Sequence, residues 1–490
     1  MEIPRSNFRP SGRLLFQLVA FLTFVGACLR ILAHGYLPPD DALRHAAFAV
    51  SGRSWDQLLV GRPEALFDQS PGWHAFLRLL HAVTGWGPEA LVLVSVGLCL
   101  LLFFLAGLLW VRHWEAWVLT LAAFFLMDGS LIQRLALGRP FVVTAALLVC
   151  LLGSVRTPGL RPWWSRHHLG WVAACALATW IHGSWYLLLL VPGAVLLAGR
   201  WREALRLGAA LLAGCLLGAT LTGHPFRFAL GQVGHLWAAL GQPATPKGLA
   251  MEFLPGLQPL LPLVFMGLAA LWNRQQIRLR GLQTDATFIL AALTWIAGYA
   301  WVWRLYLDWA FPAMALWTTW QLDEALSEAQ LPTWGRVQLS ALAAVAFVAI
   351  TGVDLSGRWT LDGSSQGLAP LRPDTDALLP EPGGVLYATS MYVFYATFFH
   401  HPHGQWRYVL GYEPGLMKAE DAAVYQASFG PQEPSRALAP WIRRMGPKDR
   451  LVLEGSSNQP PRITALSWTY TGINKWVGRK LEQTPGNPAR

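Results

Sequence analysis

The sequence predicts an α-helical protein that crosses a membrane about 11 times and ends in a small α/β domain. Three observations support this fold class. Hydrophobic residues make up 54% of the 490 residues and charged residues only 13%, about half the share of a typical soluble protein. Apolar runs of about 15 to 22 residues, long enough to cross or nearly cross a bilayer, recur through residues 1–355. The composition then changes, because the last part of the chain carries most of the lysines and much of the proline.

The predicted spans follow one another through a transmembrane domain at 1–355. Lysine and arginine gather in every second connection, and the positive-inside rule assigns those connections to the cytoplasm. The N-terminus is therefore expected in the cytoplasm, and the alternation fits a multi-pass protein of a bacterial inner membrane. The spans are expected at 14–33, 89–111, 115–128, 140–154, 168–182, 184–199, 205–222, 256–272, 285–303, 305–321 and 337–353.

Two regions are expected on the outer face: a long first loop at 34–88 and a soluble domain at 356–490. A stretch rich in Gly, Ser, Pro and Asp at 355–382 predicts a linker. Short apolar stretches that predict strands alternate with helical patterns beyond it, which is typical of a small α/β domain. The strands are expected at 383–390, 406–411 and 450–456, and the helices at 417–430 and 434–446.

The net charge of +10 does not indicate nucleic-acid binding. The arginines lie at span ends and form no single basic face, so no nucleic-acid partner is expected. The five cysteines all lie in apolar runs without metal or disulfide spacing, which is typical of small buried hydrophobic residues. The stretch HHPHG at 400–404 could bind a metal, but no acid or cysteine is near it in sequence, and a solvated loop is the simpler interpretation.

The first outer loop is expected to contain two helices at the membrane surface, which would frame a cleft. The stretch DDALRHAAFAVSGRSW at 40–55 follows two prolines, has an aspartate able to cap a helix, and has Gly52 to end it. The stretch SPGWHAFLRLLHAVTGW at 70–86 predicts the second helix. Its apolar side is formed by Trp73, Phe76, Leu77 and Leu80.

Asp40 and Asp41 stand side by side at the start of this loop, in a chain with only 28 acidic residues. One interpretation is helix capping, because carboxylates favour a helix N-terminus. A single aspartate suffices for that, and two adjacent carboxylates repel each other. The other interpretation is a general base, or half of a metal site for a phosphate leaving group. The local sequence leaves both open.

This arrangement resembles the GT-C glycosyltransferases, among them the aminoarabinose transferases and protein mannosyltransferases. The likeness lies in a cytoplasmic N-terminus, a first span, an acidic pair on an outer loop with two surface helices, about eleven spans and an outer C-terminal domain. Four stretches are similar to family motifs: DDALRHAAFAVSGRSW (40–55), LFDQSPGWHAFL (66–77), RLALGRPFVVTAALLV (134–149) and WRLYLDWAFPAM (303–314). The chain departs from the family at Gln69 and Ser70, where relatives often carry Lys or His, and it lacks a spaced Asp-x-Asp.

The resemblance implies a catalytic base at Asp41 or Asp40, with Asp41 favoured. It implies stabilisation of a departing phosphate by arginine, since a guanidinium can grip phosphate with two hydrogen bonds. No cofactor is certain, and a divalent cation stays open. The substrate-binding candidates are Arg44, His45, Asp68, Gln69, Arg139, His182, Arg304 and Tyr306.

Each candidate also has a structural interpretation. Arg139 and Arg304 could simply extend to the membrane interface. Arg304 could form an i,i+4 ion pair with Asp308, an acid whose place in an apolar run calls for a partner or a function. Asp128 could pair with Arg134 or cap the next turn. A single histidine such as His182 more often serves an interface than a substrate.

The function that the sequence predicts is transfer of a hexose or pentose from a polyprenyl-phosphate-linked donor on the outer face. The acceptor would be a lipid, a glycan or a protein, and membrane lipids would surround the spans. A transporter or flippase is the first alternative, but the acids gather at one face and no duplication is visible. A lipid-linked glycan ligase or polymerase is the second, although the loop at 223–255 is modest for that class.

Overall fold

The computed structural model describes residues 10–156, 165–232, 260–273, 285–360, 368, 378–455, 459–471 and 474–480. The chain divides into two compact units that are not continuous in sequence. The helical unit comprises Met1–Tyr36, Leu93–Leu240 and Met251–Thr360, and the sheet unit comprises Leu37–Val92, Gly241–Ala250 and Leu361–Arg490. Residues 37–92, which contain most of the expected first outer loop at 34–88, therefore group with the C-terminal residues.

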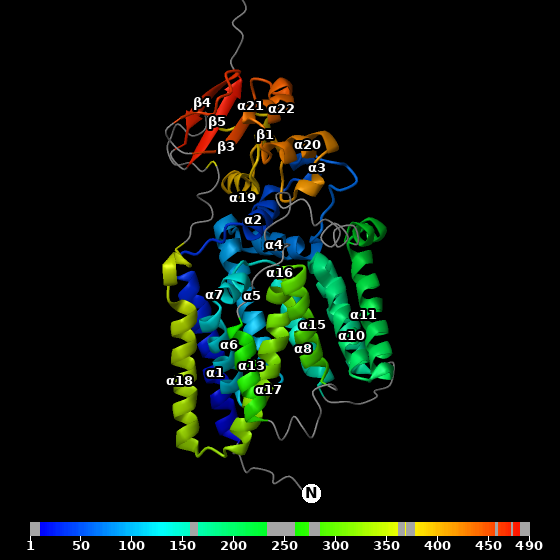
Figure 1. Cartoon of the computed structure of the whole chain (residues 1–490), viewed down its shortest axis with the longest axis vertical. Helices are drawn as coiled ribbons and strands as arrows, with labels where there is room; N and C mark the ends of the chain where they lie inside the picture. The colour runs from blue at the N-terminus through cyan, green and yellow to red at the C-terminus, as the bar shows by residue number, and fades with distance from the viewer. Residues whose placement is uncertain are drawn as a thin grey trace, which may run out of the picture. The chain divides into compact units, whose positions relative to one another are not determined.

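The helical unit is built from long apolar helices that stand side by side (Figure 1). Their sequences are rich in Leu, Ala, Val and Phe, which form helices that are apolar on all sides. The helices are α1 (Pro10–Leu32), α5 (Pro88–Leu108, which begins in the sheet unit's range), α6 (Trp114–Met127), α8 (Phe141–Val155), α9 (Arg166–Ile181), α10 (Leu190–Leu197), α11 (Trp201–Leu221), α13 (Leu261–Trp272), α15 (Ala286–Ala300), α17 (Phe311–Glu328) and α18 (Thr333–Gly352).

Small residues let helices α9 and α11 approach each other backbone to backbone. A Cβ atom at Gly214 would lie 2.5 Å from the carbonyl oxygen of Val172, and one at Gly218 would lie 2.4 Å from that of Ala176. Both contacts are too short for any side chain, so the pair depends on glycine. Close packing through small residues is how membrane helices associate, because the lipid supplies no hydrophobic drive between them.

Every predicted span coincides with a helix or a helical pair, and the chain has the apolar helices of a multi-pass membrane protein. Within the described residues, four helices are long and apolar enough to cross a bilayer alone, namely α1, α5, α11 and α18. A fifth span would arise if α6 and the next helix count together, and other apolar helices are shorter than 18 residues. The count of about 11 spans stays a prediction.

Two irregular features interrupt the helices. After α6 the chain turns by 112° into α7 (Gly129–Leu135), a short helix where the sequence suggested only an outer connection. Before α17 the chain forms a short helix α16 (Trp303–Leu305) and then a π-helical turn, η4 (Tyr306–Ala310). A π turn adds a residue to the helix and re-aims its side chains, and such turns are frequent at functional sites.

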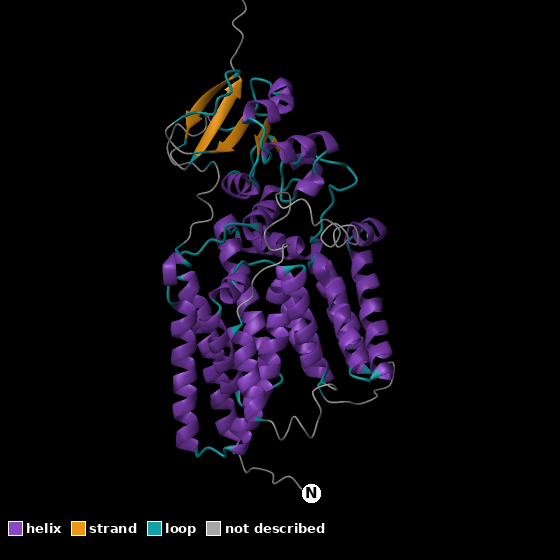
Figure 2. Ribbon diagram, in the orientation of Figure 1, coloured by secondary structure: helices purple, strands orange, loops and turns teal. Residues whose placement is uncertain are grey.

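The sheet unit contains the strands of the described chain, drawn in orange in Figure 2. Its five strands have the order β2-β1-β3-β5-β4; β1, β2 and β3 are parallel, whereas β5 is antiparallel to β3 and β4. The strands are β1 (Val385–Ala388), β2 (Arg407–Tyr408), β3 (Arg450–Glu454), β4 (Leu466–Tyr470) and β5 (Lys475–Lys480). The helices are α2 (Asp41–Ser51), α3 (Trp55–Leu58), α4 (Pro71–Thr84), α19 (Met391–His400), α20 (Ala419–Ser428), α21 (Pro434–Ala437) and α22 (Ala439–Arg444).

The early segment 59–61 joins the sheet at its β2 edge. Leu59 bridges to Tyr408 in parallel and Gly61 bridges to Met417 antiparallel. The N–H of Val60 donates to the carbonyl of Tyr408 at 2.8 Å. A Cβ atom at Gly61 would lie 2.6 Å from the carbonyl oxygen of Leu416, so the strand-like pairing depends on this glycine. These hydrogen bonds hold α2 to α4 in the same unit as the C-terminal sheet.

The predicted elements of the C-terminal region are confirmed for three strands and two helical segments. Helix α19 and strands β4 and β5 are not among the predicted elements, although β4 (LSWTY) alternates apolar and polar residues as a half-buried strand does. The predicted linker at 355–382 lies mostly outside the described residues. The helices expected at 40–55 and 70–86 are present as α2 and α4, and Gly52 ends α2 with a φ of 66°.

Candidate functional site

The acidic pair opens helix α2 in the sheet unit, but its carboxylates do not cap the helix. Asp40 occupies the N-cap position, yet its side chain makes no capping hydrogen bond. Its backbone carbonyl accepts the N–H of Leu43 at 2.9 Å instead. Asp41 forms an ion pair with Arg44 one turn later, with Oδ1 2.6 Å from Nε. Asp40 therefore makes no capping hydrogen bond, whereas Asp41 lies in the first turn of α2, where a negative charge is favoured by the helix dipole.

Arg44 lies in an aromatic box. Its guanidinium carbon lies 4.0 Å from the centre of the Tyr412 ring and 5.8 Å from that of Trp55. Burial alone would lower the pKa of Arg44, but the Asp41 carboxylate raises it overall, so the positive charge is permanent. Burial raises the pKa of Tyr412, which keeps the phenol neutral. The box holds one arginine in one orientation beside Asp41.

A chain of three side chains lies within the same unit. His74 Nδ1 is 2.7 and 2.8 Å from the two carboxylate oxygens of Asp68, and His74 Nε2 is 2.7 Å from Nδ1 of His45. A carboxylate only accepts hydrogen bonds, so the Nδ1–H of His74 donates to Asp68. When His74 is neutral, its Nε2 accepts, and the Nδ1–H of His45 donates to it. The tautomers of both rings are set by Asp68.

The charge state of this relay follows from burial. Burial lowers the pKa of His74, which keeps the ring neutral near pH 7 despite the adjoining carboxylate. Burial alone would raise the pKa of Asp68, but the His74 ring and the N–H of Ser70 lower it overall, so Asp68 stays ionised. His45 and His74 are 2% and 1% exposed. The relay can pass a proton between two imidazoles without exposing either to bulk water.

Four of the predicted site residues in the sheet unit make such contacts. Asp41 and Arg44 form the ion pair, and His45 and Asp68 are both hydrogen-bonded to His74. Gln69 follows Asp68 directly in the chain and is half-buried. The sequence analysis missed His74 and Tyr412 as members of these sets. His74 stands four residues after Ser70 in the quoted helix entry, so the motif contained it, but nothing in the sequence predicts the contact of Tyr412 with Arg44.

The helical unit holds a second charged cluster, centred on Asp308. Arg134 donates from Nε to Oδ1 at 2.8 Å and from Nη2 to Oδ2 at 2.9 Å, a two-pronged pair that is almost fully buried. Arg304 donates from Nε to Oδ2 at 2.9 Å, and this confirms the expected i,i+4 pair. One carboxylate therefore binds two guanidinium groups, and the second of them, Arg304, keeps 22% of its side chain exposed.

Asp128 joins this region of the helical unit from the break between α6 and α7. Its Oδ1 accepts the Ser130 N–H at 3.0 Å and the Ser130 hydroxyl at 2.6 Å, which confirms that it caps the next turn and does not pair with Arg134. Its Oδ2 accepts the hydroxyl of Tyr306 at 3.0 Å. The π turn carries both Tyr306 and Asp308, so one irregular turn binds the α6–α7 break at two points.

The other candidates of the helical unit lie at helix ends. Arg139 precedes α8, and its backbone carbonyl accepts a weak hydrogen bond from Cys99 Sγ at 3.6 Å. His182 follows α9, with its ring 6.4 Å from that of Phe141. Across the described residues, no group of three or more His, Cys, Asp or Glu side chains could hold a metal ion. The substrate roles of Arg139, His182, Arg304 and Tyr306 remain predictions.

No protein-family model matches the sequence, and no curated protein matches it. Its fold, however, is similar to those of solved GT-C glycosyltransferases. ArnT from Cupriavidus metallidurans bound to undecaprenyl phosphate superposes with a TM-score of 0.57 at 14% identity, over 98% of this chain and 100% of that one. The identity is low, so the similarity concerns the fold.

Two further structures agree. The oligosaccharyltransferase AglB from Archaeoglobus fulgidus, in complex with an inhibitory peptide and a dolichol-phosphate, gives a TM-score of 0.51 at 13% identity, over 89% of this chain and 69% of that one. The mycobacterial arabinofuranosyltransferase AftD gives 0.52 at 16% identity, over 96% of this chain and 40% of that one. The expected GT-C architecture is therefore confirmed.

Proposed function

We propose that this protein is a membrane glycosyltransferase that moves a sugar from a polyprenyl-phosphate-linked donor to an acceptor on the outer face of a bacterial inner membrane. The observation that supports this most is the GT-C fold, shared along the whole length of an ArnT structure that binds undecaprenyl phosphate. The acceptor is a lipid, a glycan or a protein, and the sugar is a hexose or a pentose. The N-terminus lies in the cytoplasm in this proposal.

The reaction needs a base for the acceptor and a place for the departing phosphate. The acceptor hydroxyl gives its proton to a carboxylate as its oxygen attacks the anomeric carbon, and the bond from that carbon to the phosphate oxygen breaks. The polyprenyl phosphate leaves with one more negative charge, which a guanidinium can stabilise.

We assign the base to Asp40. Asp41 faces the permanent charge of Arg44 at 2.6 Å, and an opposite charge so close disfavours taking up a proton. The resemblance drawn from the sequence favours Asp41 instead, so each carboxylate needs its own variant. In the proposal, Asp41 and the aromatic box fix Arg44, and Asp40 takes the proton.

We assign the phosphate to Arg304. Asp308 binds its Nε, and this bond orients the planar guanidinium, while Arg134 neutralises Asp308 from the other side. Arg304→Lys keeps the charge but loses the planar fork, so we expect the KM for the donor to rise about tenfold or more. If the KM for the donor does not change, Arg304 does not bind the phosphate of the donor.

The experiment that tests the function uses the full chain in proteoliposomes with a panel of radiolabelled polyprenyl-phosphate sugars and envelope lipids, glycans and peptides as acceptors. Release of polyprenyl phosphate together with transfer of label is the readout. Asp40→Asn is expected to reduce turnover by about 10²- to 10⁴-fold, the usual contribution of a general base. Asp41→Asn should cost much less.

Asp56→Asn is the matched control, because Asp56 is an exposed acid on helix α3 of the same unit. It should leave turnover unchanged. Full activity in both Asp40→Asn and Asp41→Asn would overturn the assignment of the base. Movement of a lipid or solute across the vesicle wall without any transfer of label would instead establish a flippase or transporter.

A further inference from the structure

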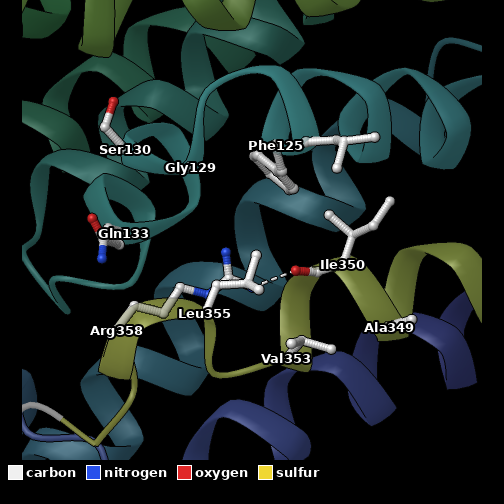
Figure 3. Close-up of a pocket in the computed structure, with 10 residues that line it drawn as sticks. Phe125, Gly129, Ser130, Gln133, Ala349, Ile350, Val353, Leu355 and Arg358 are labelled. Atoms are coloured by element: carbon white, nitrogen blue, oxygen red, sulfur yellow. Dashed lines mark hydrogen bonds between the residues drawn. The ribbon is translucent and has the colours of Figure 1, made fainter.

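A groove of about 530 Å³ lies in the helical unit between the end of α6, the start of α7 and the end of α18 (Figure 3). Its walls are mostly apolar, with Phe125 and Leu126 on one side and Ala349, Ile350 and Val353 on the other. Polar groups line the rest, from Ser130, Gln133 and Arg358. This volume falls in the range of sites for small ligands and is too small for a folded partner.

Arg358 is the positive charge among the residues that line the groove. The residue is 8% exposed, so more than nine-tenths of it is buried. Its Nη2 donates to the carbonyl oxygens of Ile350 and Thr351 in the last turn of α18, and its guanidinium lies 4.9 Å from the Trp359 ring. Its Nε, however, is buried without a hydrogen-bond partner among the described residues.

Capping of α18 explains only part of this arrangement. A cap needs one donor nitrogen, and Nη2 supplies it. An unpaired N–H of a buried guanidinium costs free energy, so this group needs an explanation beyond the cap. Asp354 is the acid nearest to Arg358 in the chain, and its oxygens accept the Trp359 N–H at 2.6 Å and the Thr360 hydroxyl at 2.8 Å. The carboxylate hydrogen-bonds to these two donors, and its charge also acts on the Arg358 guanidinium.

We propose that this groove binds an anionic phospholipid of the surrounding bilayer. The phosphate of the headgroup accepts from the Arg358 guanidinium, and one acyl chain lies along the apolar walls. The Ser130 hydroxyl and the Gln133 amide lie at the same groove and can serve the glycerol oxygens. The ligand stabilises the end of α18 against the α6–α7 break, and this role does not depend on the proposed transfer reaction.

The apolar side of the groove favours a lipid over a free anion. Leu126 is 70% exposed, Leu355 is 58% exposed and Val353 is 47% exposed. Large apolar side chains gathered at one opening indicate contact with hydrocarbon. A free phosphate would use Arg358 and leave this wall in water, whereas a phospholipid covers both.

Native mass spectrometry of the delipidated full chain in detergent tests the proposal. Palmitoyl-oleoyl phosphatidylglycerol is the probe, and phosphatidylcholine with the same chains is the neutral comparison. We expect one phosphatidylglycerol to bind at least tenfold more tightly than phosphatidylcholine. Arg358→Gln should weaken this binding at least tenfold, whereas Arg202→Gln, which removes an exposed arginine on α11, should not.

A second pair of variants separates binding from folding. Ala349→Trp fills the groove without touching Arg358, and Val345→Trp places the same ring one turn earlier on α18, at a 70% exposed position that does not line the groove. Only Ala349→Trp should abolish binding, with both variants keeping the unfolding temperature of the parent. The proposal is overturned if both Arg358→Gln and Ala349→Trp bind phosphatidylglycerol as tightly as the parent protein.

Three competition results would also overturn it. Displacement of phosphatidylglycerol by inorganic phosphate would make the groove a simple anion site. Displacement by undecaprenyl phosphate at lower concentration, with the same response to Ala349→Trp, would make it a site for the carrier. Equal binding of phosphatidylcholine and phosphatidylglycerol would show that Arg358 does not select for the negative charge of the lipid headgroup. Loss of sugar transfer in Asp40→Asn has no bearing on any of these outcomes.

Discussion

Each of the two units contains an ion pair between an aspartate and an arginine, but the two pairs differ in sequence separation and in burial. In the sheet unit, Asp41 and Arg44 are three residues apart on one helix, and their side chains are 22% and 12% exposed. In the helical unit, Asp308 binds Arg134 across 174 positions of sequence, and their side chains are 6% and 5% exposed. The first pair forms wherever the helix forms, whereas the second requires the whole helical unit.

This difference decides what each pair contributes to stability. The pair on helix α2 contributes less, because it is local to one helix, is less deeply buried, and leaves Arg44 in contact with the Tyr412 and Trp55 rings. A buried pair is costly to make, but it is far more costly to break, because the remaining charge has no compensation. We therefore expect the helical unit to depend on its pair much more than the sheet unit does.

The largest expected effect follows from Asp308→Asn. The change leaves the buried Arg134 without its counter-charge, and breaking such a pair costs about 3–5 kcal/mol. Thermal unfolding in detergent measures this loss. The same exchange at Asp41 should cost less, because Arg44 is more exposed than Arg134 and keeps its contacts with the Tyr412 and Trp55 rings, so equal losses at the two positions would contradict the comparison.

A double variant sharpens the same point. Replacing Arg134 by Met and Asp308 by Leu together removes both buried charges, and well-packed apolar substitutes for a buried ion pair are often neutral or stabilising. Most of the stability lost in Asp308→Asn should return in this variant, while the KM for the donor rises because Arg304 loses its orienting acid. A double variant as unstable as Asp308→Asn would show that packing, and not charge, was lost.

A smaller effect is expected from Gly61→Ala in the sheet unit. The added Cβ would lie 2.6 Å from the backbone oxygen of Leu416, and such overpacking costs about 1–3 kcal/mol. Hydrogen exchange should then rise at Val60 and Arg62, whose N–H groups bond to residues 408 and 416. Gly415→Ala is the control, since a Cβ there meets nothing within 4 Å.

The smallest expected effect is the response of the sheet unit to acid. Burial lowers the pKa of His74 in the folded state, so the unfolded chain takes up a proton first as the pH falls below its ordinary value of about 6.5. His74 thus favours the folded state fully above that pH and progressively less below it. Unfolding of the chain at pH 5 and 7.5 measures the loss.

His74→Gln is the comparison for the acid response, because it cannot take up a proton. Its stability should change less between pH 7.5 and pH 5 than that of the parent. Asp68 adds to the loss only at lower pH, because its lowered pKa keeps it ionised until the pH falls below the ordinary range of a carboxyl. If the stability of parent and variant changes equally between pH 7.5 and pH 5, His74 does not contribute to the pH dependence.

Most of the fold could be predicted from the sequence because its signals are local. Apolar runs placed a helix at each expected span, and Gly52 ended helix α2 as expected. The missing elements have weaker or shorter signals. Helix α7 follows a 112° break that the apolar period does not reveal. Strand β4 alternates over only five residues, and β5 is buried at four successive positions without alternation.

The contacts in the candidate sites also divide into local ones, which the sequence can predict, and distant ones, which it cannot. Asp41 with Arg44 and Arg304 with Asp308 lie one helical turn apart, so their pairing follows from spacing. The contacts of Arg134 with Asp308 and of Tyr412 with Arg44 join segments hundreds of residues apart, and no single sequence contains that information. The π turn at Tyr306–Ala310 also leaves no sequence signature, although it re-aims two of the side chains that matter most.

The pairing of segment 59–61 with the C-terminal sheet sets an order for biosynthesis. Arg53 hydrogen-bonds the carbonyl of Gly404, a residue synthesised 351 positions later. Translation proceeds at about 5–20 residues per second, so roughly 20–70 seconds pass between the synthesis of helices α2 to α4 and that of the strands they pair with. During that time the helical unit is being synthesised, and segment 59–61 has no strand to pair with. A ribosome that stalls anywhere before β2 would therefore leave a chain with helices in the membrane and an early loop exposed to proteases.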